Sequence, residues 1–238
     1  MRVAVIAGSI SGGFRIAREI ECLPGVEVFV LACSVGKRSR LLRWTREVLS
    51  ALKSFKWVTL AARVYGYARR GRLIILHHPL DDATSIERVR SLQCDVGLHA
   101  ANVIYREPVI SAFRLGILNA HIGILPKYRG RCVAEWSILQ GEPTGVTVFF
   151  IDPGIDTGAR IVLREFIPSN GWRNVRALKN MLFRCDARLY RKALEALMSA
   201  EFSLESNDIS KGQRYYVMSR LFTKVVNKIL ATTHIVAG

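Results

Sequence analysis

The sequence lacks any run of about 18 apolar residues, the length that a membrane-spanning helix needs, although half of its 238 residues are hydrophobic. Its five cysteines are scattered, odd in number and without Cys-x-x-Cys spacing, which argues against a disulfide framework and against a zinc site. Residues 1–8 are too few and wrongly flanked for a signal peptide. We therefore expect a cytoplasmic protein with reduced thiols, no bound metal and a substantial core.

Acidic residues are also scarce, because 19 Asp and Glu stand against 35 Lys and Arg and leave a net charge of +16. Residues 37–72 contain eleven basic residues and one acidic residue, Glu47. Apolar residues recur between them at helical spacing, which predicts a basic amphipathic helix inserted into the fold. Such a segment suits contact with RNA or with the inner surface of a membrane, and equally a solvated helix face.

Short apolar runs alternate with helical patterns along the first two thirds of the chain, and glycine-rich residues 8–13 connect the first run to the first helix. This alternation predicts an α/β fold with a doubly wound, mostly parallel sheet and ligands at the carboxyl ends of its strands. We expect a loop at 126–130 and a helical C-terminal extension. The expected strands are 2–7, 26–33, 72–77, 96–101, 117–120 and 145–151, and the expected helices 14–21, 81–92, 133–139, 172–200 and 215–230.

Two segments carry candidate chemistry. Residues 118–130 read Leu-Asn-Ala-His-Ile-Gly-Ile-Leu-Pro-Lys-Tyr-Arg-Gly, and Asn119 and His121 share one face if this stretch begins as a strand. A carboxamide beside an imidazole suits the binding of an oxyanion in acyl transfer. Residues 152–158 then place Asp156 on a glycine-rich turn, where its carboxylate can orient or charge the histidine. A structural Asn–His pair and a plain Asx turn are the alternatives.

In this order the two segments resemble the signature of the folate-dependent formyltransferases, over roughly residues 90–163. Asn119 and His121 match the Asn-x-His pair of that family, Asp156 matches its essential Asp, and Gly123 stands where the family usually has Ser. The resemblance implies a formyltransferase-type Rossmann-like core. It also implies transfer of a formyl group from 10-formyltetrahydrofolate to a primary amine.

The resemblance also implies roles for the three residues. Asn119 and a cationic His121 would donate hydrogen bonds to the oxyanion that forms when the amine attacks the formyl carbon. Asp156 would favour the cationic imidazole and help to accept the amine proton through water.

Binding residues follow from the resemblance by position. The loop at Tyr128, Arg129 and Gly130 would border the acceptor, with Arg129 available for an anionic group. The folate would be held mainly by backbone groups. The residues at those positions are Asn102, Ile104, Tyr105, Arg106, Ile151 and Asp152.

Members of the family differ in the amine that accepts the formyl group. Amino-sugar formyltransferases share the Tyr-Arg-Gly loop and vary at the C-terminus, so a nucleotide-linked amino sugar is the expected acceptor. The methionyl-tRNA enzyme has a basic insertion but a β-rich C-terminal domain, and the glycinamide ribonucleotide enzyme usually reads Tyr-Pro-Gly. Hydrolysis of 10-formyltetrahydrofolate and a non-catalytic membrane- or RNA-binding relative are further alternatives.

We expect a catalytic domain at 1–167, with its basic helical insertion at about 37–71, and a helical extension at 168–238. A homodimer contact is one expected use of the last helix.

Overall fold

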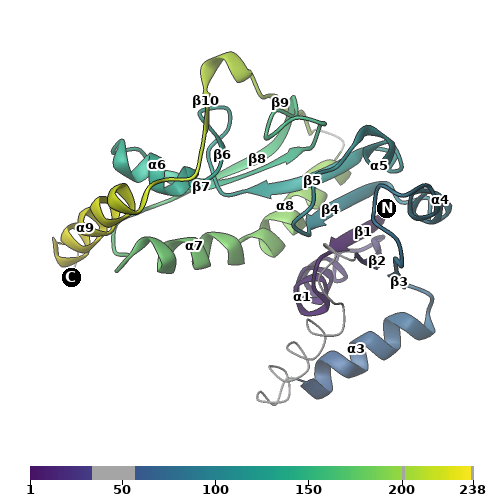
Figure 1. The fold of residues 1–238 in the computed structure, drawn as a ribbon. Coiled ribbons are helices and arrows are strands. Elements are labelled where there is room, and N and C mark those ends of the chain that lie inside the picture. Colours follow the sequence, from purple (N-terminus) through teal and green to yellow (C-terminus); the bar gives the residue numbers. More distant parts are fainter. Residues whose placement is uncertain (34–56, 200–201, 237–238) are drawn as a thin grey trace. The chain divides into compact units, whose positions relative to one another are not determined.

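The computed structural model describes residues 1–33, 57–199 and 202–236 (Figure 1). The chain forms two compact units, Met1–Ile117 and Leu118–Gly238. The first part of the expected basic insertion, residues 37–56, lies outside the described residues, and α3 (Trp57–Arg69) follows it. None of the helices in the described ranges is long and apolar enough to cross a membrane.

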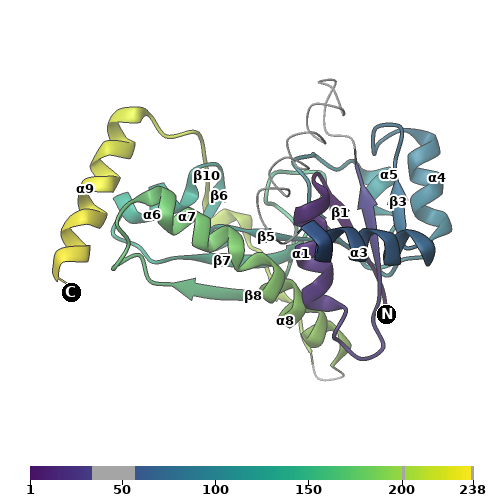
Figure 2. The ribbon, with the colours of Figure 1, turned by 90° about the horizontal axis from the view of Figure 1, so that it is seen from below.

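The first unit is a parallel sheet flanked by helices. Its strands run in the order β3-β2-β1-β4, with every neighbouring pair parallel. Figure 2 shows α1 and α4 on opposite sides of these strands, as expected for a doubly wound sheet. The strands are β1 (Arg2–Ala7), β2 (Glu27–Ala32), β3 (Leu73–Ile75) and β4 (Val96–Ala100), and the other helices are α1 (Ile10–Ile20), α4 (Ala83–Ser91) and α5 (Glu107–Ile110).

Local sequence explains these elements. Residues 3–7 of β1 are fully buried, which is the pattern of a central strand covered on both faces. Ser9 caps α1 by accepting a hydrogen bond from the amide of Gly12, and Asp82 caps α4 by accepting one from the amide of Thr84. A Cβ at Gly13 would lie 2.6 Å from that of Ala7, so the glycine-rich turn allows α1 to pack closely on β1.

The second unit contains antiparallel strands in the order β5-β7-β8-β9 and a separate parallel pair, β10-β6. Helix α8 packs against β7 and β8, while α6, α7 and α9 pack together. The strands are β5 (Gly116–His121, from Leu118 in this unit), β6 (Tyr128–Gly130), β7 (Thr144–Phe150), β8 (Arg160–Ile167), β9 (Glu205–Ser206) and β10 (Gln213–Tyr215). The helices are α6 (Val133–Leu139), α7 (Val175–Arg184), α8 (Asp186–Met198) and α9 (Arg220–Val236), with a 3-10 turn at Ile209–Lys211.

The α/β class, with a parallel sheet, flanking helices and C-terminal helices, is confirmed. Several details of the second unit differ from expectation. The loop expected at 126–130 contains β6, the single helix expected at 172–200 is two helices that meet at Cys185, and β8 was not expected at all. Strand β9 was not expected either, and the helix expected at 215–230 begins at Arg220, since Tyr215 lies in β10. The division at residue 167 stays a prediction.

Candidate active site

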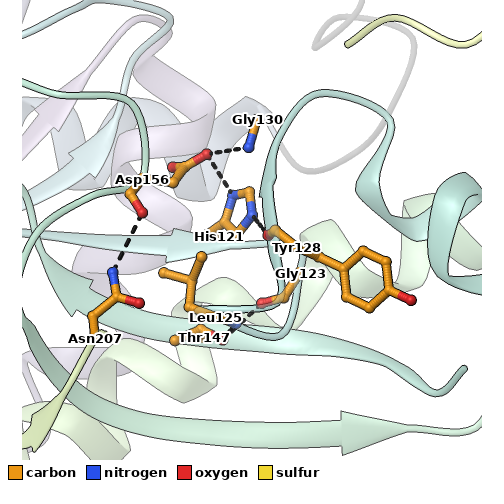
Figure 3. Close-up of polar contacts among 8 residues, drawn as sticks. All are labelled: His121, Gly123, Leu125, Tyr128, Gly130, Thr147, Asp156 and Asn207. Carbon is orange, nitrogen blue, oxygen red and sulfur yellow. Dashed lines mark hydrogen bonds and ion pairs between the residues drawn. The ribbon is translucent and has the colours of Figure 1, made fainter. Parts of the chain in front are cut away.

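The imidazole of His121 lies between two hydrogen-bond acceptors at the end of β5 (Figure 3). Its Nε2 is 2.9 Å from the carbonyl oxygen of Tyr128, and its Nδ1 is 3.5 Å from Oδ2 of Asp156. The side chains of His121 and Asp156 are only 7% and 12% exposed. A carbonyl can only accept, so Nε2 carries a proton and donates a hydrogen bond to the Tyr128 oxygen, while Nδ1 faces the Asp156 carboxylate.

Asp156 reaches this position from a tight turn between β7 and β8. Its φ of +54° lies in the left-handed region, which is uncommon for a residue other than glycine. Its Oδ2 also accepts a hydrogen bond of 2.8 Å from the amide of Gly130. Asp152 braces the same turn, because its Oδ1 accepts from the amide of Gly154 at 3.0 Å and from the hydroxyl of Thr157 at 2.7 Å.

Asn119 stands two residues before His121 on β5, where it is half-buried and pairs with Phe149 of β7. In the described ranges its carboxamide makes no hydrogen bond with a protein group, so both of its N–H donors remain available to a ligand. The structure thus brings His121 and Asp156 into contact. The N–H groups of Asn119, unlike those of His121, are not engaged by any described residue.

Gly123 determines where the imidazole can lie. A Cβ at this position would be 2.6 Å from Nε2 of His121 and 2.9 Å from the carbonyl oxygen of Tyr128. Both contacts are far shorter than packing permits. The absence of a side chain at Gly123 therefore leaves the space in which His121 meets the Tyr128 carbonyl.

The expected acceptor loop serves the site through its backbone. The ring of Tyr128 is buried and stacked on Tyr215 at 5.2 Å, and its hydroxyl donates to Oε1 of Gln140 at 2.7 Å. Burial, the neighbouring Tyr215 and the charge of Glu142 raise the pKa of Tyr128 to about 12, so its hydroxyl stays neutral.

Arg129 turns away from His121 toward the C-terminal segment. Its terminal nitrogen lies 3.4 Å from the carbonyl oxygens of Ile209 and Gly212. Direct contact of Tyr128, Arg129 and Gly130 with an acceptor stays a prediction.

The residues expected to hold the folate fall into both units. In the first unit Tyr105 is buried and its hydroxyl bonds to Nδ1 of His99 at 2.8 Å, whereas the side chain of Ile104 is 81% exposed. Asn102 is exposed, and Arg106 lies before α5 with its Nε 4.0 Å from Asp81. Ile151 and Asp152 are half-buried in the second unit. Folate binding by these residues stays a prediction.

Sequence reasoning missed two buried polar residues beside the pair. Thr147 is fully buried, donates to the carbonyl of Gly123 at 2.7 Å and accepts from the amide of Leu125 at 3.1 Å. The signal for Thr147 was present, because it is the one polar side chain in the run Gly-Val-Thr-Val-Phe-Phe. Asn207, which donates to the carbonyl of Asp156, lies in a polar stretch that gave no such signal.

No cluster of three or more His, Cys, Asp or Glu side chains suited to a metal ion occurs in the part of the chain that the structure describes. The fold and the site define an α/β protein in which a buried imidazole–carboxylate pair follows a strand-borne carboxamide. Residues 70–179 match the family model described as Formyl transferase. The matched segment contains Asn119, His121 and Asp156, so the part of the chain that carries the site is similar to formyltransferases.

Similar proteins agree with this assignment. Methionyl-tRNA formyltransferase of Parabacteroides distasonis is 30% identical over 132 residues, which cover 55% of this chain and 40% of that protein. The chain spans less than half the length of the first curated relatives it matches.

Solved structures share the fold over nearly the whole chain. A 4-N formyltransferase from Francisella tularensis gives a TM-score of 0.61 at 14% identity, covering 98% of this chain and 87% of that one. The formyltransferase PseJ from Anoxybacillus kamchatkensis, solved in complex with UDP-4,6-dideoxy-4-formamido-L-AltNAc and tetrahydrofolate, gives 0.55 at 14% identity and covers 98% and 100%.

Proposed function

We propose that this chain is an N-formyltransferase that moves a formyl group from 10-formyltetrahydrofolate to the primary amine of a nucleotide-linked amino sugar. The observation that carries the proposal is the contact between His121 and Asp156, whose Nδ1 and Oδ2 are 3.5 Å apart. Asn119 lies two residues before His121, and its carboxamide has no hydrogen-bond partner among the described residues. All three residues fall within the segment that matches the family model. An imidazole–carboxylate pair and a free amide donor are what transfer of an acyl group requires.

Asn119 is the hydrogen-bond donor in this mechanism. The site suits 10-formyltetrahydrofolate because the carboxamide of Asn119 is half-buried and its N–H groups have no protein partner among the described residues. One of these groups would donate to the formyl oxygen as negative charge develops there. A single donor of this kind commonly lowers a barrier by about 2.7–4 kcal/mol.

His121 and Asp156 supply charge and handle the proton. The carboxylate of Asp156 lies 3.5 Å from Nδ1 of His121, and an imidazolium ring paired with it would stabilise the developing oxyanion. Direct donation by Nε2 requires that its hydrogen bond to the Tyr128 carbonyl breaks, which a rotation of the ring achieves. Asp156 would accept the proton that the amine loses, through a bridging water. The bond from the formyl carbon to the folate nitrogen would break as that nitrogen takes up a proton, which releases tetrahydrofolate.

The donor-binding part of the proposal keeps the residues expected from the sequence. The proposed folate contacts are backbone groups near Asn102, Ile104, Tyr105 and Arg106 in the first unit, and those of Ile151 and Asp152 in the second unit. The exposed apolar side chain of Ile104 supports a role in contacting a flat ring, since an isoleucine that exposed buries little surface within its own unit.

Two observations bear on the acceptor. The Tyr-Arg-Gly sequence at residues 128–130, which amino-sugar formyltransferases share, supports a sugar acceptor, and PseJ, which has the same fold, binds a formamido-sugar nucleotide. The second candidate is methionyl-tRNA, and the 30% identity to the Parabacteroides enzyme favours it. The formyl-transfer chemistry of Asn119, His121 and Asp156 is common to both.

The test is formation of tetrahydrofolate and of formylated product by the purified protein given 10-formyltetrahydrofolate. The amines would be amino-sugar nucleotides, glycinamide ribonucleotide and methionyl-tRNA, each alone, with a reaction lacking amine as the control. Product formed only with an amino-sugar nucleotide is the expected result. Product only with methionyl-tRNA would establish the second candidate. Tetrahydrofolate released without amine would indicate a hydrolase, and no release by the folded protein would contradict the proposal.

A further inference from the structure

The C-terminal segment 205–215, which follows the end of the family-model match at residue 179, reaches back to the site. Asn207 is its most buried residue, with only 4% of its surface exposed. Its carboxamide nitrogen donates to the carbonyl oxygen of Asp156 at 3.3 Å (Figure 3). The same nitrogen also donates to the carbonyl oxygen of Gly158 at 3.0 Å. Its backbone amide also donates to Ala159 at 2.9 Å. One residue thus holds three positions of the turn that carries the carboxylate.

This turn needs external support because its own geometry is unfavourable. Asp156 adopts a φ of +54°, in the left-handed region that disfavours a residue with a side chain. The bonds from Asp152 brace residues 154 and 157 but do not reach Asp156. Among the described residues, Asn207 is the side chain that fixes the backbone of Asp156 itself.

The same segment also fixes the group that donates to the Asp156 carboxylate. Strand β10 pairs in parallel with β6, and the carbonyl of Tyr215 accepts a hydrogen bond of 3.0 Å from Arg131. A Cβ at Gly130 would lie 2.3 Å from that carbonyl, so only glycine permits this pairing. Gly130 in turn donates to Oδ2 of Asp156. The C-terminal segment therefore supports the carboxylate from two sides.

The orientation of the Asn207 amide follows from its surroundings. Both neighbours of the nitrogen are carbonyl oxygens, which can only accept, so the NH₂ group must face them. The amide oxygen is then buried and has no partner among the described residues. A buried polar atom without a partner costs stability, and such costs are concentrated at functional sites.

We propose that Asn207 is a positioning residue for catalysis: its carboxamide holds the Asp156 turn so that the carboxylate stays in contact with His121. This inference rests on the proposed function. It extends the site beyond the segment that matches the family model, since the carboxylate and the group that positions it come from distant parts of the sequence.

The chain offers a matched pair of variants for the test. In Asn207→Asp an isosteric carboxylate replaces the donor, so its oxygens face two carbonyl oxygens. In Asn227→Asp the replaced amide is an acceptor, because Oδ1 of Asn227 accepts from the amide of Val175 at 2.9 Å, and the carboxylate keeps that bond. We expect Asn207→Asp to lower kcat about 10- to 100-fold, as a displaced catalytic group does, with KM for the amine little changed. Asn227→Asp should leave both constants near those of the unaltered protein. Asn207→Ala buries no charge and should lower kcat in the same way. It replaces Asn207→Asp in the test if the Asp variant does not fold.

A double-mutant cycle separates positioning from a general structural effect. In an Asp156→Asn background, Asn207→Ala should change single-turnover rates by no more than about twofold to threefold, because the group it positions is already gone. A full further loss in that background, or normal kcat in a folded Asn207→Ala protein, would overturn the inference while leaving the proposed function intact. Absence of formyl transfer by the unaltered protein would overturn both.

Discussion

The two units of the chain differ in the kinds of side chain that they bury. Among the described residues of the first unit, Ser85 is the one buried polar residue, and the parallel strands form an ordinary hydrophobic core. Six other buried polar or charged residues of the described ranges lie in the second unit: His121, Glu135, Ser137, Thr144, Thr147 and Asn207. Because a buried polar group costs free energy unless it is hydrogen-bonded, the second unit gives up stability where it builds a site. The comparison predicts that substitutions in the first unit act mainly on folding and those in the second mainly on chemistry.

The largest expected effect on stability is in the first unit. Ile6 is fully buried at the centre of the parallel sheet, and Ile6→Ala should lower the free energy of unfolding by about 2–5 kcal/mol. Ile6→Val removes one methylene and should cost about 0.5–1.5 kcal/mol. Urea unfolding measures the free energy of unfolding of both variants and of the unaltered protein. Equal effects of the two substitutions would contradict the close packing of this core.

The largest expected effect on rate is in the second unit. Asn119→Ala should lower kcat about 100- to 1,000-fold, the usual loss when one oxyanion donor is removed. The folded structure should be unchanged, because the carboxamide makes no hydrogen bond within the described part of the chain. Steady-state kinetics and circular dichroism measure the two properties. Near-normal turnover by a folded Asn119→Ala protein would remove Asn119 from the mechanism.

A smaller effect is expected where the family pattern is interrupted. Gly123→Ser adds a Cβ that would lie 2.6 Å from Nε2 of His121, so the ring must leave the Tyr128 carbonyl. Overpacking of this kind typically costs about 1–3 kcal/mol of stability. The ¹⁵N chemical shifts of the His121 ring should report loss of the hydrogen bond, while those of His99 should not move. Unchanged shifts for His121 would show that Gly123 does not determine the position of the ring.

The smallest effect belongs to the surface of the second unit. Hydrogen bonds from Arg188, and then Lys192, lower the pKa of Glu165. The stabilisation is therefore present above the pKa of Glu165 in the unfolded chain and is lost as the pH falls through its lower pKa in the folded protein. Glu165→Gln should cost about 0.2–1 kcal/mol at pH 7 and nothing in acid, as thermal unfolding at both pH values would show.

Glu195→Gln, which removes the single exposed pair with Arg191, is the control for that substitution. It should change the unfolding temperature less than Glu165→Gln does, because Glu165 contacts two basic residues. A penalty for Glu165→Gln that persists unchanged in acid would contradict the charge-based explanation.

The elements predicted well from the sequence are those with strong local signals. Val133–Leu139 forms the expected helix, and Asp82 caps α4 within the expected region. The apolar run at Val96–Ala100 forms the expected strand. Each is determined by residues within a few positions of one another, so periodicity and capping are sufficient.

The elements that were missed depend on contacts between distant residues. Strand β6 is three residues long and exists because it pairs with β10, and no local pattern at either strand indicates the other. The Asn–His spacing and the glycine-rich turn identified the site residues as candidates. The hydrogen bond from His121 to Tyr128, permitted by Gly123, could not be predicted, because it depends on the path of the chain through three separate segments.

The pairing of β6 with β10 has a consequence for synthesis on the ribosome. The ribosome makes Asn119, His121 and Asp156 well before it makes Asn207 and the last strand. A nascent chain can fold its first unit as it emerges, since domains generally fold in N- to C-terminal order. The bonds from Asn207 to the Asp156 turn and the pairing of β6 with β10 nevertheless form only after Gln213–Tyr215 has left the exit tunnel. An unfinished chain therefore carries Asn119, His121 and Asp156 before it carries the segment that contacts their surroundings.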